Sequence, residues 1–470
     1  MKENPYREDW DDLKELLRQY DDLKNGRKQI FLDEEDFEKI IDYFDEKEAA
    51  SLAMEAAEMG ADCFPFSSSI LIRKADLLLT ANKYQDALHL LDHIETLDSS
   101  NIDIYILKSS AYLALDLQQK AVEILEKALT IFEGEERVDL LFELTDVYDD
   151  YEEFEKIFDC LQLILNEEPN NEEALLKICF WTDFTGRNEE SIRLHKKIID
   201  DFPYNELAWF NLGAAYQGLK LYEKAIDAYH FSVTIDEKFD YAYRNMADAF
   251  IRLRKFKEAI EMLEKVAELS KPDPLIFEAI GHCFDKLNNN AQARFYYRKA
   301  SHINPEEGKL YYKTACTYFN EGQWESAAKQ LEAALKIQPS HPAYNLLMGE
   351  CKLQQENWNE AIQYFFIVVR ARPKNESGWE SLLRGLYKAN AINEGLIQVE
   401  LALKNTNSKP LFLYYYSAFL FAAGKSKEAV LQLEKAMQKK SKLLKKFVEL
   451  NTSILQNQQV VNVISKFKKL

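Results

Sequence analysis

The chain has 470 residues, of which 47% are hydrophobic and 29% charged, so it has enough apolar surface for an extended core and is not a mainly disordered protein. Its formal net charge of -20 at pH 7 repels phosphate groups, so we expect no nucleic-acid partner. Its longest apolar run, from Leu411 to Gly424, is too short to cross a bilayer, so we expect no membrane insertion. The small numbers of Pro (11) and Gly (14) favour many helices joined by short turns.

Residues 1–67 predict an N-terminal helix followed by a divergent helix pair. Trp10, Leu13 and Leu17 recur at helical spacing, and Asp33 is suited to cap the helix that begins in EEDFEKIIDYF. The first residues, MKENPYREDWDD, lack the apolar core and the small-residue cleavage site of a signal peptide. We therefore expect a cytoplasmic protein.

The clearest motif of the chain lies between Asn205 and Asp236, in the segment NELAWFNLGAAYQGLKLYEKAIDAYHFSVTID. This segment fits the pattern W-x2-L-G-x2-Y followed by A-x3-[FY]. The residues at the fixed positions are Trp209, Leu212, Gly213, Tyr216, Ala225 and Tyr229. In this pattern the segment resembles a tetratricopeptide repeat (TPR), a unit of about 34 residues that forms a pair of helices.

The same pattern recurs along the chain, and two extra residues precede Asp139. A small residue, predicted just before the second helix of each unit, lets the two helices approach closely. It is found at Ala87, Ala121, Ser191, Ala225, Ala259, Ala293, Ala327, Ala361, Gly395 and Ala429, with Ile157 as the exception. A large apolar residue also recurs early in each first helix, and Asn345 interrupts that series. We predict eleven units over residues 68–443 and capping helices over residues 444–470.

The resemblance to TPR proteins covers nearly the whole chain, which is similar to long cytoplasmic TPR arrays of Bacteroidota. It implies an all-α fold, an α-α superhelix in which antiparallel helix pairs form a right-handed TPR solenoid. The first helices of such a solenoid line a concave groove. The resemblance further implies a non-catalytic scaffold for protein–protein interaction, which binds a peptide or a protein segment in this groove.

The residues that carry chemistry form no catalytic constellation, so we expect no enzyme activity, no cofactor and no metal. His89 and His93 lie four residues apart, but no third ligand accompanies them. His282 falls on the predicted groove face beside Glu278 and Asp285, without a nucleophile. The six Cys form no C-x-x-C pair, and we interpret them as small hydrophobic residues.

The predicted partner-binding positions lie outside the packing stripe of the first helices, at the spacing i, i+4 and i+7. In four successive units they are Phe142, Asp146 and Asp149, then Leu176, Phe180 and Asp183, then Phe210, Ala214 and Gln217, then Arg244, Asp248 and Ile251, joined by Asp150, Phe184 and Tyr241. Because aromatic and acidic residues are mixed there, we predict that residues 139–252 bind an extended segment with Lys or Arg beside apolar side chains. The alternative is that the aromatic residues pack between adjacent first helices. The first two positions lack the Lys and Asn with which TPR co-chaperones bind a carboxylate.

A second possible function is that of a structural or assembly subunit, which self-associates or docks through its termini and convex face. The stretch KKSKLLKK near the C-terminus is basic, whereas the N-terminal region is acidic. Contacts between such ends would weaken in salt. The sequence leaves the oligomeric state open.

Overall fold

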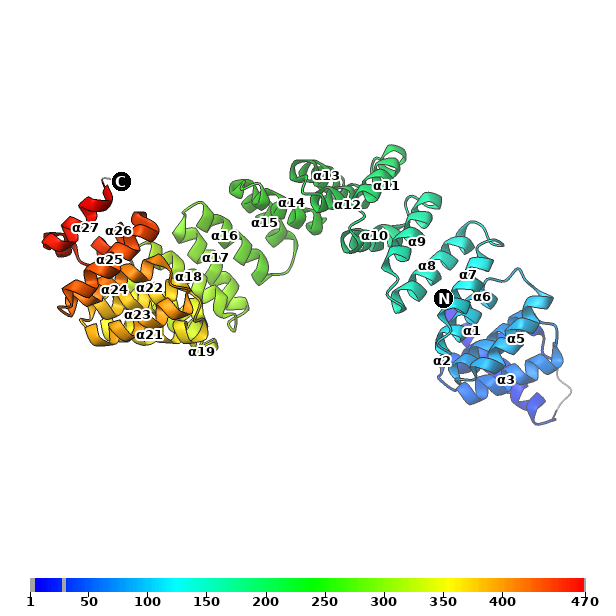
Figure 1. The fold of residues 1–470 in the computed structure, drawn as a ribbon. Coiled ribbons are helices and arrows are strands. Elements are labelled where there is room, and N and C mark those ends of the chain that lie inside the picture. The colour runs from blue at the N-terminus through cyan, green and yellow to red at the C-terminus, as the bar shows by residue number, and fades with distance from the viewer. Residues whose placement is uncertain (1–4, 28–30, 469–470) are drawn as a thin grey trace. The chain divides into compact units, whose positions relative to one another are not determined.

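The computed structural model describes residues 5–27 and 31–468, and every regular element within these ranges is a helix (Figure 1). The fold is therefore all-α, as predicted. The chain divides into two compact units, Met1–Asp236 and Glu237–Leu470. None of the described helices is long and apolar enough to span a membrane. The side chain of Trp10 lies outside the described part of the chain.

In the first unit, helices that follow each other in the chain pack against each other. They are α1 (Pro5–Lys24), α2 (Glu34–Glu46), α3 (Ala50–Cys63), α4 (Ser68–Thr80), α5 (Tyr84–Leu97), α6 (Asp103–Ala114), α7 (Gln118–Ala128), α8 (Glu135–Asp150), α9 (Phe154–Glu167), α10 (Glu172–Thr185), α11 (Asn188–Asp201), α12 (Glu206–Gly218) and α13 (Tyr222–Ile235). The first helix of a pair also contacts the first helix of the next pair, as α2 contacts α4. The unit is therefore a stack of helix pairs.

The second unit repeats this order of contacts. Its elements are α14 (Asp240–Arg252), α15 (Phe256–Leu269), α16 (Pro274–Lys286), α17 (Asn290–Ile303), α18 (Gly308–Asn320), α19 (Trp324–Ile337), α20 (Pro342–Gln354), α21 (Trp358–Ala371), α22 (Glu376–Lys388), α23 (Ile392–Asn405), α24 (Pro410–Ala422), α25 (Ser426–Lys440), the 3-10 helix η1 (Ser441–Leu443), α26 (Leu444–Leu450), η2 (Thr452–Gln456) and α27 (Gln458–Lys468). The helices after α25 are the shorter ones and end the stack.

One residue with a positive φ angle closes the turn inside each helix pair. The residues at this position are Glu48, Asn82, Asp116, Glu152, Gly186, Lys220, Arg254, Asn288, Gly322, Glu356, Asn390 and Gly424. For a residue with a side chain, this left-handed conformation costs roughly 1–2 kcal/mol. Only three of these positions carry glycine, so the turns of most pairs contain this strain.

Several pairs are held close by an aromatic ring that lies on a glycine. A Cβ atom added at Gly213 of α12 would come within 2.6 Å of the Tyr229 ring of α13. At Gly349 of α20 the added atom would lie 2.4 Å from the Phe365 ring of α21. The missing side chain therefore sets the distance between the two helices of these pairs.

A hydrogen bond ties the start of several first helices to the preceding turn. The indole nitrogen of Trp379 donates to the carbonyl oxygen of Pro373 at 2.7 Å, and Trp209 makes an equivalent bond. Asn345, which interrupts the series of large apolar residues, donates through Nδ2 to the carbonyl oxygen of Pro339 at 2.8 Å. Asn345 therefore replaces the hydrogen bond of the tryptophan, although not its ring.

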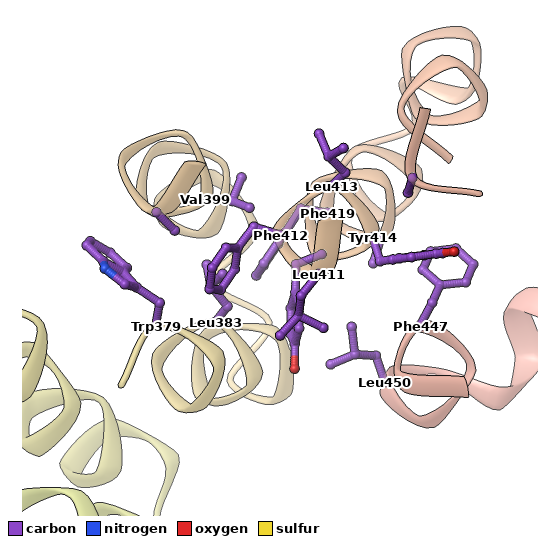
Figure 2. Close-up of a cluster of buried hydrophobic side chains, with 14 of the residues drawn as sticks. Trp379, Leu383, Val399, Leu411, Phe412, Leu413, Tyr414, Phe419, Phe447 and Leu450 are labelled. Atoms are coloured by element: carbon purple, nitrogen blue, oxygen red, sulfur yellow. The ribbon is translucent and has the colours of Figure 1, made fainter. Parts of the chain in front are cut away.

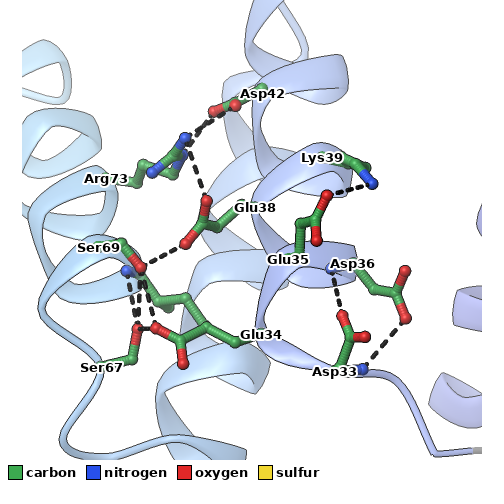
Figure 3. A network of polar contacts seen from close by, with 11 residues as sticks. Asp33, Glu34, Glu35, Asp36, Glu38, Lys39, Asp42, Ser67, Ser69 and Arg73 are labelled. Atoms are coloured by element: carbon green, nitrogen blue, oxygen red, sulfur yellow. Dashed lines mark hydrogen bonds and ion pairs between the residues drawn. The ribbon is translucent and has the colours of Figure 1, made fainter.

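Polar side chains link the first helices of neighbouring pairs, as Figure 3 shows for α2 and α4. Asp33 caps α2 in a capping box with Asp36. Arg73 on α4 donates to Asp42 on α2, with Nε 2.7 Å from Oδ1. Ser69 on α4 also donates to Glu38 on α2.

The second unit contains equivalent links between first helices. The Nζ atom of Lys313 on α18 lies 2.6 Å from Oε1 of Glu278 on α16. Arg384 on α22 pairs with Glu350 on α20. Each link therefore joins one pair to the pair before it.

A lysine occupies the core of the pair α6–α7. Lys108 takes the position in α6 that Leu144 holds in α8, and only 2% of its side chain is exposed. Its Nζ atom lies 2.7 Å from Oδ1 of Asp92 and also pairs with Glu95, both on α5. The two carboxylates compensate the buried charge.

A buried polar cluster connects α10, α11 and α12. His195 on α11 is fully buried, and its Nδ1 atom lies 2.8 Å from the carbonyl oxygen of Ser191. Its Nε2 atom lies 3.2 Å from Nδ2 of Asn211 on α12, which also donates to the carbonyl oxygen of Leu175 on α10 at 2.7 Å. Burial lowers the pKa of His195 to about 4. The neutral ring therefore donates through Nδ1 to Ser191 and accepts through Nε2 from Asn211.

The second unit ends in a large apolar core that joins α22, α24 and the terminal helices (Figure 2). Trp379 and Leu383 of α22 are buried in this core with Phe412 of α24. Phe447 of α26 is fully buried there as well, beside Tyr414. The terminal helices therefore cover apolar side chains that the last pair would otherwise expose.

Candidate protein-binding surface

We call the side chains at the predicted i, i+4 and i+7 positions of each first helix the first-helix face. On α8 and α10 its members are Phe142, Asp146, Asp149, Leu176, Phe180 and Asp183, with Asp150 and Phe184 beside them. Phe142 is half-buried, and the other seven side chains are exposed. On these two helices the face is therefore open to solvent.

An aromatic cluster forms the centre of the face on α10. Phe180 and Phe184 are 60% and 57% exposed, and their ring centroids lie 5.9 Å apart. Phe154 at the start of α9 lies 4.8 Å from Phe184, and Trp181 lies 4.9 Å from Phe180. Phe154 and Trp181 were not predicted as site residues. The only signal for them is their closeness in the sequence to other aromatic residues, which a helix–turn–helix brings together.

The first-helix face of α8 and α10 also carries acidic side chains. Among the described residues, no Lys or Arg pairs with the four exposed carboxylates, which are those of Asp146, Asp149, Asp150 and Asp183. Burial, together with the charges of Asp146 and Asp139, raises the pKa of Glu143 on α8. The first-helix face of α8 and α10 therefore combines exposed rings with exposed carboxylates, which suits a positively charged ligand.

A lysine of the protein already makes a contact of this kind. The Nζ atom of Lys177 on α10 lies 5.0 Å from the ring centroid of Phe142 on α8. The same atom lies 2.7 Å from Oε1 of Glu173. One face of the Phe142 ring is therefore taken by a cation of the chain itself, which leaves Phe180 and Phe184 as the more open rings.

On α12, two predicted site residues contact the second helix of their own pair. The Phe210 ring lies 5.7 Å from that of Tyr229, and the Tyr229 hydroxyl donates to Oε1 of Gln217 at 3.1 Å. Both side chains are half-buried. These contacts join the two helices of one pair, whereas the predicted alternative placed the aromatic residues between adjacent first helices.

Four further predicted residues belong to the second unit, and one of them, Ile251, is half-buried. Tyr241 is 63% exposed. Arg244 pairs with Asp273, with Nη1 3.1 Å from Oδ2, and Asp248 accepts from Nε of Arg252 at 3.4 Å. Arg244 and Asp248 of α14 are therefore engaged in ion pairs within the protein, unlike the exposed carboxylates of α8 and α10.

The histidines considered for chemistry are not gathered into a site. His89 and His93 are both exposed on α5. His282 is half-buried, and burial followed by repulsion from Lys313 lowers its pKa. Glu278, which the sequence places beside it, binds Lys313 instead. No group of His, Cys, Asp and Glu that could hold a metal ion is found in the part of the chain that the structure describes.

The cysteines are mostly core residues. Burial raises the pKa of the Cys160 thiol to about 12 and that of Cys179 to about 11. Cys283 and Cys351 are fully buried, and Cys179 and Cys316 are half-buried. Cys63 differs from the prediction, because it ends α3 on the exposed side.

Family models match the regions in which these helix pairs occur. One model described as Tetratricopeptide repeat matches residues 102–134 and 207–239, and another with the same description matches residues 242–275. The chain is a tetratricopeptide repeat protein. Within this TPR protein, residues 286–367 also match a model described as Anaphase-promoting complex, cyclosome, subunit 3.

Curated relatives share a low identity with this TPR protein. Tetratricopeptide repeat-containing protein trd-1 of Caenorhabditis elegans is 25% identical over 188 residues, which are 38% of this chain and 24% of the relative. TPR repeat-containing protein YpiA of Bacillus subtilis is 25% identical over 343 residues, 63% of this chain and 79% of the relative. The chain spans less than half the length of the first curated relatives that it matches.

The solved structure of YrrB, a TPR protein, has 20% sequence identity with the chain. The match covers 39% of this chain and 95% of YrrB, with a TM-score of 0.35.

Proposed function

We propose that this TPR protein is a non-catalytic scaffold that binds a segment of a partner protein on the first-helix face of α8 and α10. The observation that carries the proposal is that the exposed pair Phe180 and Phe184 shares the first-helix face of α8 and α10 with four exposed carboxylates. Exposed apolar patches that are rimmed by polar residues are typical of interaction sites. TPR proteins bind protein partners, which supports the general role.

The chemistry of the face favours a partner segment that carries Lys or Arg beside apolar side chains. A cation of the segment would meet the carboxylates of Asp146 and Asp183 and the faces of the Phe rings. Its apolar side chains would bury the edges of Phe180 and Phe184. The contact of Lys177 with Phe142 is an internal example of this geometry.

A titration with a defined peptide tests this proposal. The probe is a short synthetic peptide in which Lys alternates with Leu and Phe, and the full-length protein is titrated with it by calorimetry. We expect Asp146→Lys combined with Asp183→Lys to weaken binding about tenfold or more, because attraction becomes repulsion. Phe180→Ser combined with Phe184→Ser should weaken it by a similar factor.

The controls use the same changes at other places of the same unit. Asp200→Lys with Asp227→Lys reverses two exposed carboxylates on α11 and α13, and Phe231→Ser removes an exposed ring from α13. Both controls should leave the affinity within about twofold of the parent. Circular dichroism verifies that each variant is folded. Equal affinities of the parent and the α8–α10 variants would refute the proposed site.

A further inference from the structure

The chain covers part of its own first-helix face near the C-terminus. Phe447 on α26 is fully buried, with its ring centroid 6.0 Å from that of Tyr414 on α24 (Figure 2). Leu450, three residues later, is 7% exposed. In the repeat register Tyr414 corresponds to Phe210 of α12, so α26 packs on the first-helix face of α24.

The same segment continues onto the first helix of the previous pair. The Nζ atom of Lys446 lies 2.6 Å from Oε1 of Glu380 on α22. Nδ2 of Asn451, the residue after α26, donates to the Tyr387 hydroxyl of α22 at 3.2 Å. Glu380 and Tyr387 are the α22 counterparts of Phe210 and Gln217, so they also belong to the first-helix face.

These contacts differ from those of an ordinary capping helix. A helix that only extends the stack touches its sequence neighbours and the next helix but one, whereas this segment contacts α24 and also reaches α22, four helices before α26. With seven residues, α26 is also too short to be stable without its contacts. It occupies the face in the manner of a bound peptide that is tethered to the stack through α25 and α27.

We infer that the first-helix face of α22 and α24 is a docking site for a short helix with Lys followed directly by Phe and, three residues later, by Leu. The segment Ser441–Gln456 is its built-in occupant and competes with a partner segment of the same pattern. Glu380 recognises the lysine, and the apolar surface around Tyr414 receives the Phe and Leu side chains. This inference does not depend on the site proposed for α8 and α10.

The covalent connection favours the chain's own segment over a free partner segment at this site. A segment joined to its site by a short connection acts at an effective concentration of about the millimolar range. A free partner therefore binds poorly while the segment is in place. Weakening the segment without changing the face should open the site to an external ligand.

The test uses the full-length protein and a fluorescent peptide with the sequence of residues 441–456, SKLLKKFVELNTSILQ. We expect the Phe447→Ala protein to bind this peptide at least about tenfold more tightly than the parent does, because its own segment has lost an anchor. A peptide that carries Phe447→Ala and Leu450→Ala should not bind. If the parent and Phe447→Ala proteins bind the peptide equally, or if the altered peptide binds as well as the original, the inference is wrong.

A charge reversal, added to the Phe447→Ala protein, gives a second test. The protein that carries Glu380→Lys in addition to Phe447→Ala should bind the original peptide at least about tenfold more weakly, and a peptide with Lys446→Glu should restore binding. Glu449→Lys in the peptide is the matched control and should have little effect, because Glu449 is exposed and contacts Lys445 of the same helix. Failure of the reversed pair to restore binding would refute the recognition by Glu380.

Light scattering identifies the occupant in the parent protein. A monomer at all concentrations is expected if each chain fills its own site. A dimer that dissociates when Phe447→Ala is introduced would mean that the segment docks on a second copy, and it would overturn the inference of a self-occupied site.

Discussion

The adjacent helix pairs α10–α11 and α12–α13 share one repeat register but are held together in different ways. In α12–α13 the Tyr229 ring lies on Gly213, and the two helices pack extensively. In α10–α11 the same two positions carry Cys179 and His195. Here α10 packs more against α9 and α12 than against α11.

The difference shows that the repeat register fixes where contacts are made, whereas the side chains decide which helices they join. A glycine under a ring draws the two helices of one pair together. In α10–α11 the buried polar groups of His195 and Asn211 need hydrogen-bond partners, and they find them on α11, α12 and α10. At α10–α11 the stabilising contacts therefore lie mainly between this pair and its neighbours, and less between α10 and α11.

Filling the space under Tyr229 should produce the largest effect. We expect Gly213→Val to lower the free energy of opening of α12 and α13 by about 2–3 kcal/mol, because the new side chain overlaps the ring. Cys179→Val, at the same position of α10, should cost about 1 kcal/mol, since that site already holds a side chain. Hydrogen exchange of the two pairs measures both values. Ala214→Val is the control for the change in helix propensity, and a Gly213→Val loss no larger than the Ala214→Val loss would contradict the close approach.

Acid should weaken the α10–α12 cluster selectively. The pKa of His195 is near 6.5 in an unfolded chain and about 4 in the folded protein. Between these values the unfolded chain binds a proton that the folded protein does not, so stability falls as the pH decreases. From pH 7 to pH 5 we expect a loss of about 2 kcal/mol.

The measurement is the hydrogen exchange of α10, α11 and α12 at both pH values, corrected for intrinsic rates. In His195→Leu, which places in this position the residue type found at Leu331 of α19, the acid-dependent loss should disappear. Persistence of the full loss in this variant would exclude His195 as its cause.

Exchanging the turn residues of the two pairs should produce the smallest effect. Gly186 and Lys220 occupy the same left-handed position, with φ of 72 and 60 degrees. We expect Lys220→Gly to stabilise its pair by about 0.5–1 kcal/mol and Gly186→Lys to destabilise its pair by a similar amount. Thermal unfolding followed by circular dichroism measures both changes. Shifts of the same sign would show that contacts of the lysine side chain outweigh the backbone strain.

The fold was predictable because its signal is repeated many times. The pattern around Trp209 and Gly213 recurs along the chain, so the repeat is recognisable even though single units deviate from it. The sequence did not predict that Lys108 would fill an apolar core position, because its compensation by Asp92 and Glu95 depends on the packing of α5 on α6. The division into eleven units stays a prediction.

The candidate site was predictable in outline only. Helical periodicity placed Asp146, Phe180 and Asp183 on one face, and all three are exposed. It could not foresee that Phe210 would turn toward Tyr229, or that Lys177 would cover Phe142, because these contacts depend on rotamers and on the spacing of neighbouring helices. Whether the face binds a partner stays a prediction.

The polar links between first helices limit how far the helix pairs can serve as interchangeable modules. Arg384 meets Glu350 only because α22 follows α20, and Lys313 meets Glu278 only because α18 follows α16. At most other places in the array the residue in the register of Glu278 is not an acid, as at Arg244 of α14 and Tyr312 of α18, so a moved pair would mostly leave its cation without a neutralising side chain. The ion pairs between neighbouring pairs therefore favour one order of the helix pairs. A shortened or shuffled array needs new ion pairs at its junctions even where every apolar contact is kept.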